Sequence, residues 1–69
     1  MPYYLVNQNA QPTGEHEVHE KNNCNHLPEP HNRKDLGWHL NCNDAIKEAK
    51  KTYNNVDGCK YCVPQCHTR

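Results

Sequence analysis

Apolar residues are scarce in this chain of 69 residues. It contains no Phe, one Trp and one Met, and hydrophobic residues make up 33% of it. Adding the three glycines leaves the apolar share well below the roughly 45–50% that is usual in globular domains. Burial of so little apolar surface offsets only part of the backbone freedom lost on folding, roughly 1–2 kcal/mol per residue. We therefore expect one small domain over residues 1–69 that needs a further source of stability.

Long hydrophobic runs and an excess of charge are also lacking. The apolar residues 3–6 are followed at once by polar ones, so the sequence predicts neither a signal peptide nor a membrane span of about 18–20 apolar residues. A cytoplasmic location is therefore expected. The formal net charge is +0, so composition supplies no general attraction to nucleic acids or to membranes.

Cysteine and histidine are abundant by contrast, with five Cys and six His. Disulfides are rare in a reducing cytoplasm, and an odd number of cysteines cannot all pair within one chain. A metal site is therefore the main interpretation, and buried free thiols or disulfides are the alternatives. Cys42 is interpreted as a small buried side chain at the start of a helix.

The strongest metal signal is the knuckle Cys59-Lys60-Tyr61-Cys62, which directly follows Gly58. Two cysteines separated by two residues on a tight turn bring their sulfurs about 3.5–4 Å apart, as tetrahedral Zn²⁺ with Zn–S bonds of about 2.3 Å requires. A redox pair of the same spacing should open a helix within a βαβ unit. Pro64 follows here instead, so the pattern favours Cys59 and Cys62 as ligands of a structural zinc ion.

The remaining ligands must come from elsewhere in the chain. Cys24 is expected as the third, because a metal joining it to Cys59 closes a long loop and anchors the polar residues 20–34. The fourth position is open among His19, Cys66 and His67. His19 precedes Cys24 by five positions, whereas Cys66 follows Cys62 by four and offers a softer donor.

Local patterns predict an α+β domain with a short antiparallel three-stranded sheet and one helix. The expected strands are residues 3–6, 15–19 and 36–40. Asn41 or Cys42 should cap the helix, with Asp44 in its first turn to complement the helix dipole. The apolar face of that helix is expected to comprise Ala45, Ile46, Ala49 and Tyr53.

This order of elements resembles the Ada-type metal-binding module, known from the N-terminal zinc domain of the Ada alkylation-repair protein and from domains appended to bacterial nucleases. The residues that carry the resemblance are His19, Cys24, Leu36-Gly37-Trp38, Asn43-Asp44-Ala45 and Cys59-Lys60-Tyr61-Cys62. The resemblance implies a small bacterial domain with one zinc ion bound by Cys24, Cys59 and Cys62, and by His19 as fourth ligand. Ada carries a Cys-x3-Cys pair where this chain has Cys24 alone, so methyl transfer is not carried over.

No intact catalytic motif accompanies the metal signal. His16-Glu17-Val18-His19 is one residue short of a zincin helix motif, and we expect no enzyme activity. The predicted function is that of a structural zinc module that contacts another protein. Metal handling or sensing is a further alternative, and so is nucleic-acid binding through the helix face formed by Lys47, Lys50 and Lys51.

Overall fold

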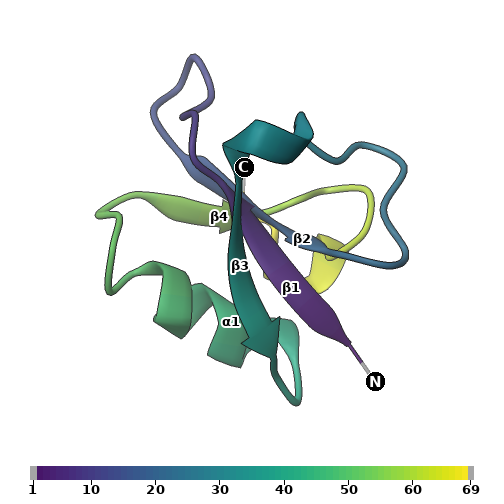
Figure 1. Cartoon of the computed structure of the whole chain (residues 1–69). Helices are drawn as coiled ribbons and strands as arrows, with labels where there is room; N and C mark the ends of the chain where they lie inside the picture. Colours follow the sequence, from purple (N-terminus) through teal and green to yellow (C-terminus); the bar gives the residue numbers. More distant parts are fainter. Residues whose placement is uncertain (1, 69) are drawn as a thin grey trace.

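The strand β1 (Tyr3–Asn7) lies at the centre of the sheet in the computed structural model, which describes residues 2–68 (Figure 1). It pairs antiparallel with β2 (His16–Glu20) on one side and with β3 (Arg33–Trp38) on the other. The aromatic and β-branched residues of β1 suit this central position. The predicted first hairpin and third strand are therefore present, and β3 begins earlier than the sequence indicated.

A fourth strand, β4 (Val56–Gly58), lies parallel to β2 and gives the sheet the order β3-β1-β2-β4. The prediction of three antiparallel strands was wrong on this point, although the α+β class is confirmed. β4 has three residues and no β-branched run, so its sequence looks like a turn. Its parallel pairing with β2 depends on the crossover through the helix, which local patterns do not reveal.

The helix α1 (Cys42–Ala49) begins where the sequence predicted, since the Asn41 side chain accepts a hydrogen bond of 3.0 Å from the backbone N–H of Asp44. Ala45 and Ala49 are fully buried on its inner face. Tyr53 lies beyond its end and stacks on His16 with ring centroids 3.8 Å apart. Among residues 2–68, no helix combines the length and apolar character needed to cross a bilayer.

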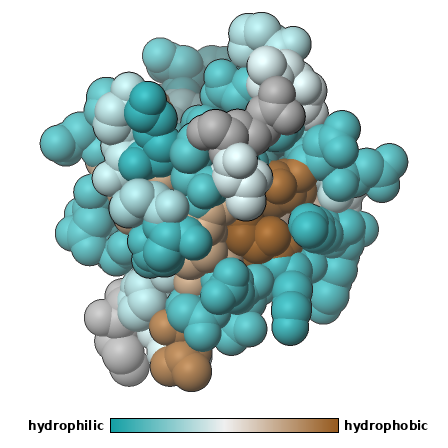
Figure 2. All heavy atoms as spheres, turned by 180° about the vertical axis from the view of Figure 1, so that it is seen from behind, coloured by the Kyte–Doolittle hydropathy of each residue, from teal (hydrophilic) through white to brown (hydrophobic). Residues whose placement is uncertain are grey.

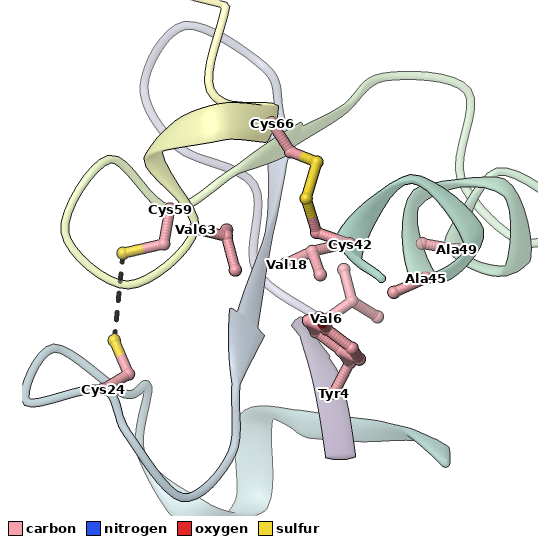
Figure 3. Close-up of a cluster of buried hydrophobic side chains, with 10 residues drawn as sticks. All are labelled: Tyr4, Val6, Val18, Cys24, Cys42, Ala45, Ala49, Cys59, Val63 and Cys66. Atoms are coloured by element: carbon pink, nitrogen blue, oxygen red, sulfur yellow. Dashed lines mark hydrogen bonds between the residues drawn. A yellow bond between two sulfur atoms is a disulfide. The ribbon is translucent and has the colours of Figure 1, made fainter. Parts of the chain in front are cut away.

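The core lies between α1 and one face of the sheet. Tyr4, Val6 and Val18 point to this face and pack in a cluster with Ala45 and Ala49, as Figure 3 shows. Strand residues alternate between faces, so the paired residues Leu5 and His19 lie on the other face, and both are 1% exposed. The sheet thus brings one histidine into a buried position beside the residues that follow β2.

A disulfide joins Cys42, at the start of α1, to Cys66 in the short 3₁₀ turn η2 (Pro64–Cys66). Their Cα atoms are 6.3 Å apart, although the residues are 24 positions apart in sequence. Cys42 is buried at the start of α1, as the sequence indicated, and its sulfur is bonded to Cys66. The pairing comes from docking the C-terminal segment against α1, a non-local contact that spacing does not indicate.

Gly58 gives a test of how closely this segment is packed. A Cβ atom at Gly58 would lie 2.9 Å from the backbone carbonyl carbon of Cys66. We expect Gly58→Ala to lower the free energy of unfolding by about 1–3 kcal/mol, because backbone atoms must shift to admit the methyl group. Urea unfolding measures the effect. Gln65→Ala, at an exposed position of the same segment, is the control and should change stability by less than about 0.5 kcal/mol. Equal stabilities of the two variants would contradict the packing.

Candidate metal centre

Four side chains from separate parts of the chain converge at the end of β2. Nitrogen or sulfur atoms of His19, Cys24, Cys59 and Cys62 all lie within 4.8 Å of one another. The Cys24 and Cys59 sulfurs are 3.8 Å apart, the pair joined by a dashed line in Figure 3. His19 Nδ1 lies 3.4 Å from the Cys24 sulfur and 4.0 Å from the Cys62 sulfur.

These separations fit a tetrahedral ion. Bonds of about 2.3 Å to sulfur and about 2.0–2.1 Å to nitrogen imply sulfur–sulfur distances of about 3.8 Å and nitrogen–sulfur distances of about 3.5 Å. The Cys24–Cys59 distance of 3.8 Å matches directly. The two nitrogen–sulfur distances, 3.4 and 4.0 Å, bracket the second value. The donor set of one imidazole and three thiols therefore suits a metal ion such as Zn²⁺ in size and in chemistry.

The knuckle is held against β2 by its own backbone. Cys59 N–H donates to the Val18 carbonyl at 2.9 Å, which places this ligand beside His19. Val63 N–H then donates to the Cys59 carbonyl at 2.9 Å and closes the turn that carries Cys62. This turn is the local geometry that the Cys-x-x-Cys spacing predicted.

Two backbone N–H groups, one at the end of β2 and one in the loop that follows it, point at sulfurs of the group. Glu20 N–H donates to the Cys62 sulfur at 3.3 Å, and His26 N–H donates to the Cys24 sulfur at 3.4 Å. The His26 ring also stacks on Tyr61, with centroids 3.9 Å apart, and so joins the Cys24 loop to the knuckle. Such N–H donors spread the negative charge of metal-bound thiolates and orient them.

His19 is oriented for ligation through Nδ1. Its other nitrogen, Nε2, lies 3.7 Å from Oε1 of Glu17. Glu17 precedes His19 by two positions in the strand, so both side chains lie on the same face of the sheet. Metal-bound histidines commonly direct their second N–H to a carboxylate in this way. The Glu17 side chain is 25% exposed, and this partial burial raises the pKa of its carboxyl group.

Burial also sets the protonation states of the metal-free site. It lowers the pKa of His19 to about 4, with the positive charge of Arg33 as a second cause, and it raises the pKa of the Cys59 and Cys62 thiols. The imidazole is therefore neutral and ready to bind at physiological pH. A redox-active or nucleophilic cysteine needs a lowered pKa, so the raised values disfavour the redox interpretation of the knuckle.

The structure brings together four of the candidate ligands and leaves two aside. Cys66 was put forward as a fourth ligand, but its sulfur is bonded to Cys42, and η2 directs it away from the knuckle. His67 Nδ1 lies 2.9 Å from the Gly58 carbonyl and 3.3 Å from Asp57 Oδ2. His19, rather than Cys66 or His67, is the fourth side chain in the group with Cys24, Cys59 and Cys62.

One signal for the disulfide was present in the composition. Once three of the five cysteines are assigned to a metal, two remain, and two can pair. The buried Asp57, which accepts hydrogen bonds from Thr68 N–H at 2.9 Å and Thr68 Oγ1 at 3.0 Å, had no such signal.

Comparisons with known proteins found no matching family model, no matching curated protein and no matching solved structure. The resemblance to Ada-type modules therefore stays a prediction. The candidate site stands on the convergence of its four side chains.

Zinc binding to a metal-free protein that stays folded should release about three protons near pH 6, one from each cysteine ligand, because thiolates bind the ion and the buried His19 is already neutral there. A histidine with its ordinary pKa near 6.5 would bring the release close to about four. Calorimetric titration in two buffers of different ionisation enthalpy counts these protons. A release near four would show that His19 is protonated in the metal-free protein, as expected where removal of the metal unfolds the chain.

The same pKa shift has a consequence for the metal-free fold. The folded pKa of His19, about 4, lies below the unfolded value, so the unfolded chain binds this proton first as the pH falls. The contribution to stability is complete above about pH 6.5 and is lost progressively towards pH 4.

Proposed function

We propose that this chain is a small zinc-binding module in which one structural Zn²⁺ is held by His19, Cys24, Cys59 and Cys62. The observation that carries the proposal is the mutual distance of at most 4.8 Å among four ligand atoms from three separate segments. Four protein ligands complete a tetrahedral shell and leave no open position for substrate, which is typical of structural rather than catalytic zinc. We therefore infer a module without catalysis of its own.

The ion would act as a cross-link in a domain whose hydrophobic core is small. Cys24 and Cys59 are 35 positions apart, and a metal that joins them restrains a long stretch of the unfolded chain. Most of the buried hydrophobic side chains are small ones such as Val, Ala and Cys, with Tyr4 and Leu5 as the large members. Metal binding and folding should therefore be closely coupled.

A second protein is the proposed partner of the module. Figure 2 shows a surface that is mostly hydrophilic on the face turned away from the view of Figure 1, with small brown areas between polar side chains. Among residues 2–68, the large apolar side chains that stay exposed are Tyr3, Trp38, Leu40 and Tyr61. Exposed aromatic residues of this kind are enriched at protein interfaces. Tyr4 is buried in the core and does not belong to this exposed set.

Nucleic-acid binding through α1 and the residues that follow it has weaker support. Lys51 is paired with Glu48 at 3.1 Å, which neutralises part of the Lys47, Lys50 and Lys51 face. The chain as a whole carries no net charge. Phosphate contacts would give binding that weakens steeply with salt, and absence of binding at low salt would exclude this function.

Removal of the metal should unfold the protein. Native mass spectrometry is expected to show one Zn²⁺ per chain, and a chelator should collapse the dispersed amide NMR spectrum, because the ion bridges the sheet and the C-terminal segment. His19→Ala should weaken zinc binding by at least about 100-fold, since even loss of an outer partner of a ligand costs about 10–100-fold. His31→Ala, at an exposed histidine outside the group, is the matched control and should bind as the wild type does.

Two results would contradict the proposal. One is a chelated protein whose amide spectrum stays dispersed, which would show that no metal holds the fold. The other is equal zinc affinity of the His19→Ala and His31→Ala variants, which would place the ion elsewhere.

A further inference from the structure

The turn that carries two of the metal ligands also carries one half of the disulfide. Cys62 precedes Cys66 by four positions, and backbone hydrogen bonds of 2.9 Å run from Val63 N–H to the Cys59 carbonyl and from Cys66 N–H to the Val63 carbonyl. Figure 3 shows the Cys59 sulfur and the Cys42–Cys66 bond on either side of Val63. The knuckle and the half-cystine therefore belong to one hydrogen-bonded unit.

Cys66 also contacts the residue that leads into the knuckle. Any side chain at Gly58 would collide with Cys66, so the two backbones are in close contact immediately before Cys59. After Cys66 the chain returns to the same strand, where His67 Nδ1 lies 2.9 Å from the Gly58 carbonyl and Thr68 N–H donates to Asp57 Oδ1. Displacement of Cys66 would therefore disturb the backbone that positions Cys59.

The other half of the disulfide is anchored in the core. Cys42 is 1% exposed at the start of α1, and α1 is fixed by the buried residues Ala45 and Ala49. Cys66 as a residue is 9% exposed, against 1% for Cys42, so Cys66 is the half of the disulfide nearer to solvent. The bond therefore ties the ligand-bearing turn to a helix whose inner face is buried in the core.

We propose that Cys42 and Cys66 form a thiol–disulfide exchange site whose redox state sets the affinity of the metal centre. The inference rests on the zinc site proposed above. The thiolate form of a low-molecular-weight thiol such as glutathione attacks the Cys66 sulfur and forms a mixed disulfide with it. The S–S bond between Cys42 and Cys66 breaks, and Cys42 leaves as a thiolate that takes up a proton. A second glutathione resolves the mixed disulfide, so two glutathione molecules become one glutathione disulfide and the protein gains two thiols.

The disulfide raises metal affinity by lowering the cost of ordering the site. With the bond intact, the turn from Cys59 to Cys66 is already tied at its far end, so the ion orders fewer free torsions when it binds. With the bond open, metal binding must order those torsions as well, so the affinity for the ion is lower. Couplings between two sites of one protein typically amount to about 5–150-fold, and we expect about 10-fold here.

Because coupling between two sites is reciprocal, bound metal shifts the reduction equilibrium of the disulfide by the same factor as the disulfide shifts metal affinity. If the disulfide form binds zinc 10-fold more tightly, the bound metal makes the disulfide 10-fold harder to reduce. A 10-fold change corresponds to a reduction potential about 30 mV more negative for this two-electron couple. The loaded protein would thus keep its disulfide in thiol concentrations that open it in the metal-free protein.

Zinc affinity in two redox states is the first test. Competition with a chromophoric chelator should give a dissociation constant for the oxidised wild type about 10-fold lower than for the Cys42→Ser/Cys66→Ser variant. Gln65→Ala, which alters an exposed residue beside Cys66, should bind zinc as the oxidised wild type does. Reduced wild-type protein should bind zinc with the same dissociation constant as the double variant. If the double variant fails to fold, the comparison of oxidised with reduced wild-type protein tests the coupling instead.

Glutathione redox titration of wild-type protein with and without Zn²⁺ is the second test. After denaturation and alkylation, the oxidised form takes up three labels and the reduced form five, and peptide mapping locates Cys42 and Cys66. The midpoint with zinc should be about 30 mV more negative than the midpoint without it.

The possible results separate this inference from the zinc site itself. Equal zinc affinity in the oxidised and reduced states, or equal midpoints with and without zinc, would overturn the coupling and leave the zinc module standing. Five labels on air-oxidised protein would show that Cys42 and Cys66 do not pair and would also overturn it. Absence of zinc binding in every state would overturn both proposals.

Discussion

The convergence of four ligand atoms at the end of β2 is the constraint on which the remaining structure depends. His19 comes from the sheet, Cys24 from the loop that follows it, and Cys59 and Cys62 from the knuckle after β4. Each segment is held near the others by a small number of backbone hydrogen bonds and by few large apolar side chains. A single ion at this point would join three parts of the chain, and a bound metal is one of the means by which very small domains reach stability.

The electrostatics of the site connect folding to metal binding. In the folded chain, burial keeps the His19 imidazole neutral and raises the pKa of the Cys59 and Cys62 thiols. A bound divalent ion would replace thiol protons, and the backbone N–H groups of Glu20 and His26 donate to two of the sulfurs. The polar contacts around the ligands are therefore arranged for the loaded state.

The Cys42–Cys66 disulfide is a second cross-link on the same C-terminal segment. The metal would tie this segment to the sheet, and the disulfide ties it to α1, so the two links hold opposite sides of one short turn. A cytoplasmic location, which the sequence analysis expects, would expose the disulfide to reducing thiols. Mutual stabilisation of the two links would account for their presence together in one small domain.

Local chemistry allowed the sequence to determine much of this protein. Three features depend on interactions within a few residues, so the sequence predicted them. They are the turn that carries Cys59 and Cys62, the Asn41 cap, and the strand formed by the β-branched, aromatic run of β1. The tertiary structure decided the choice of His19 over Cys66, the parallel pairing of β4 with β2, and the Cys42–Cys66 bond. Each of these depends on where segments far apart in the chain are brought together, and that placement follows from the packing of α1 and the C-terminal segment against the sheet, which no local spacing encodes.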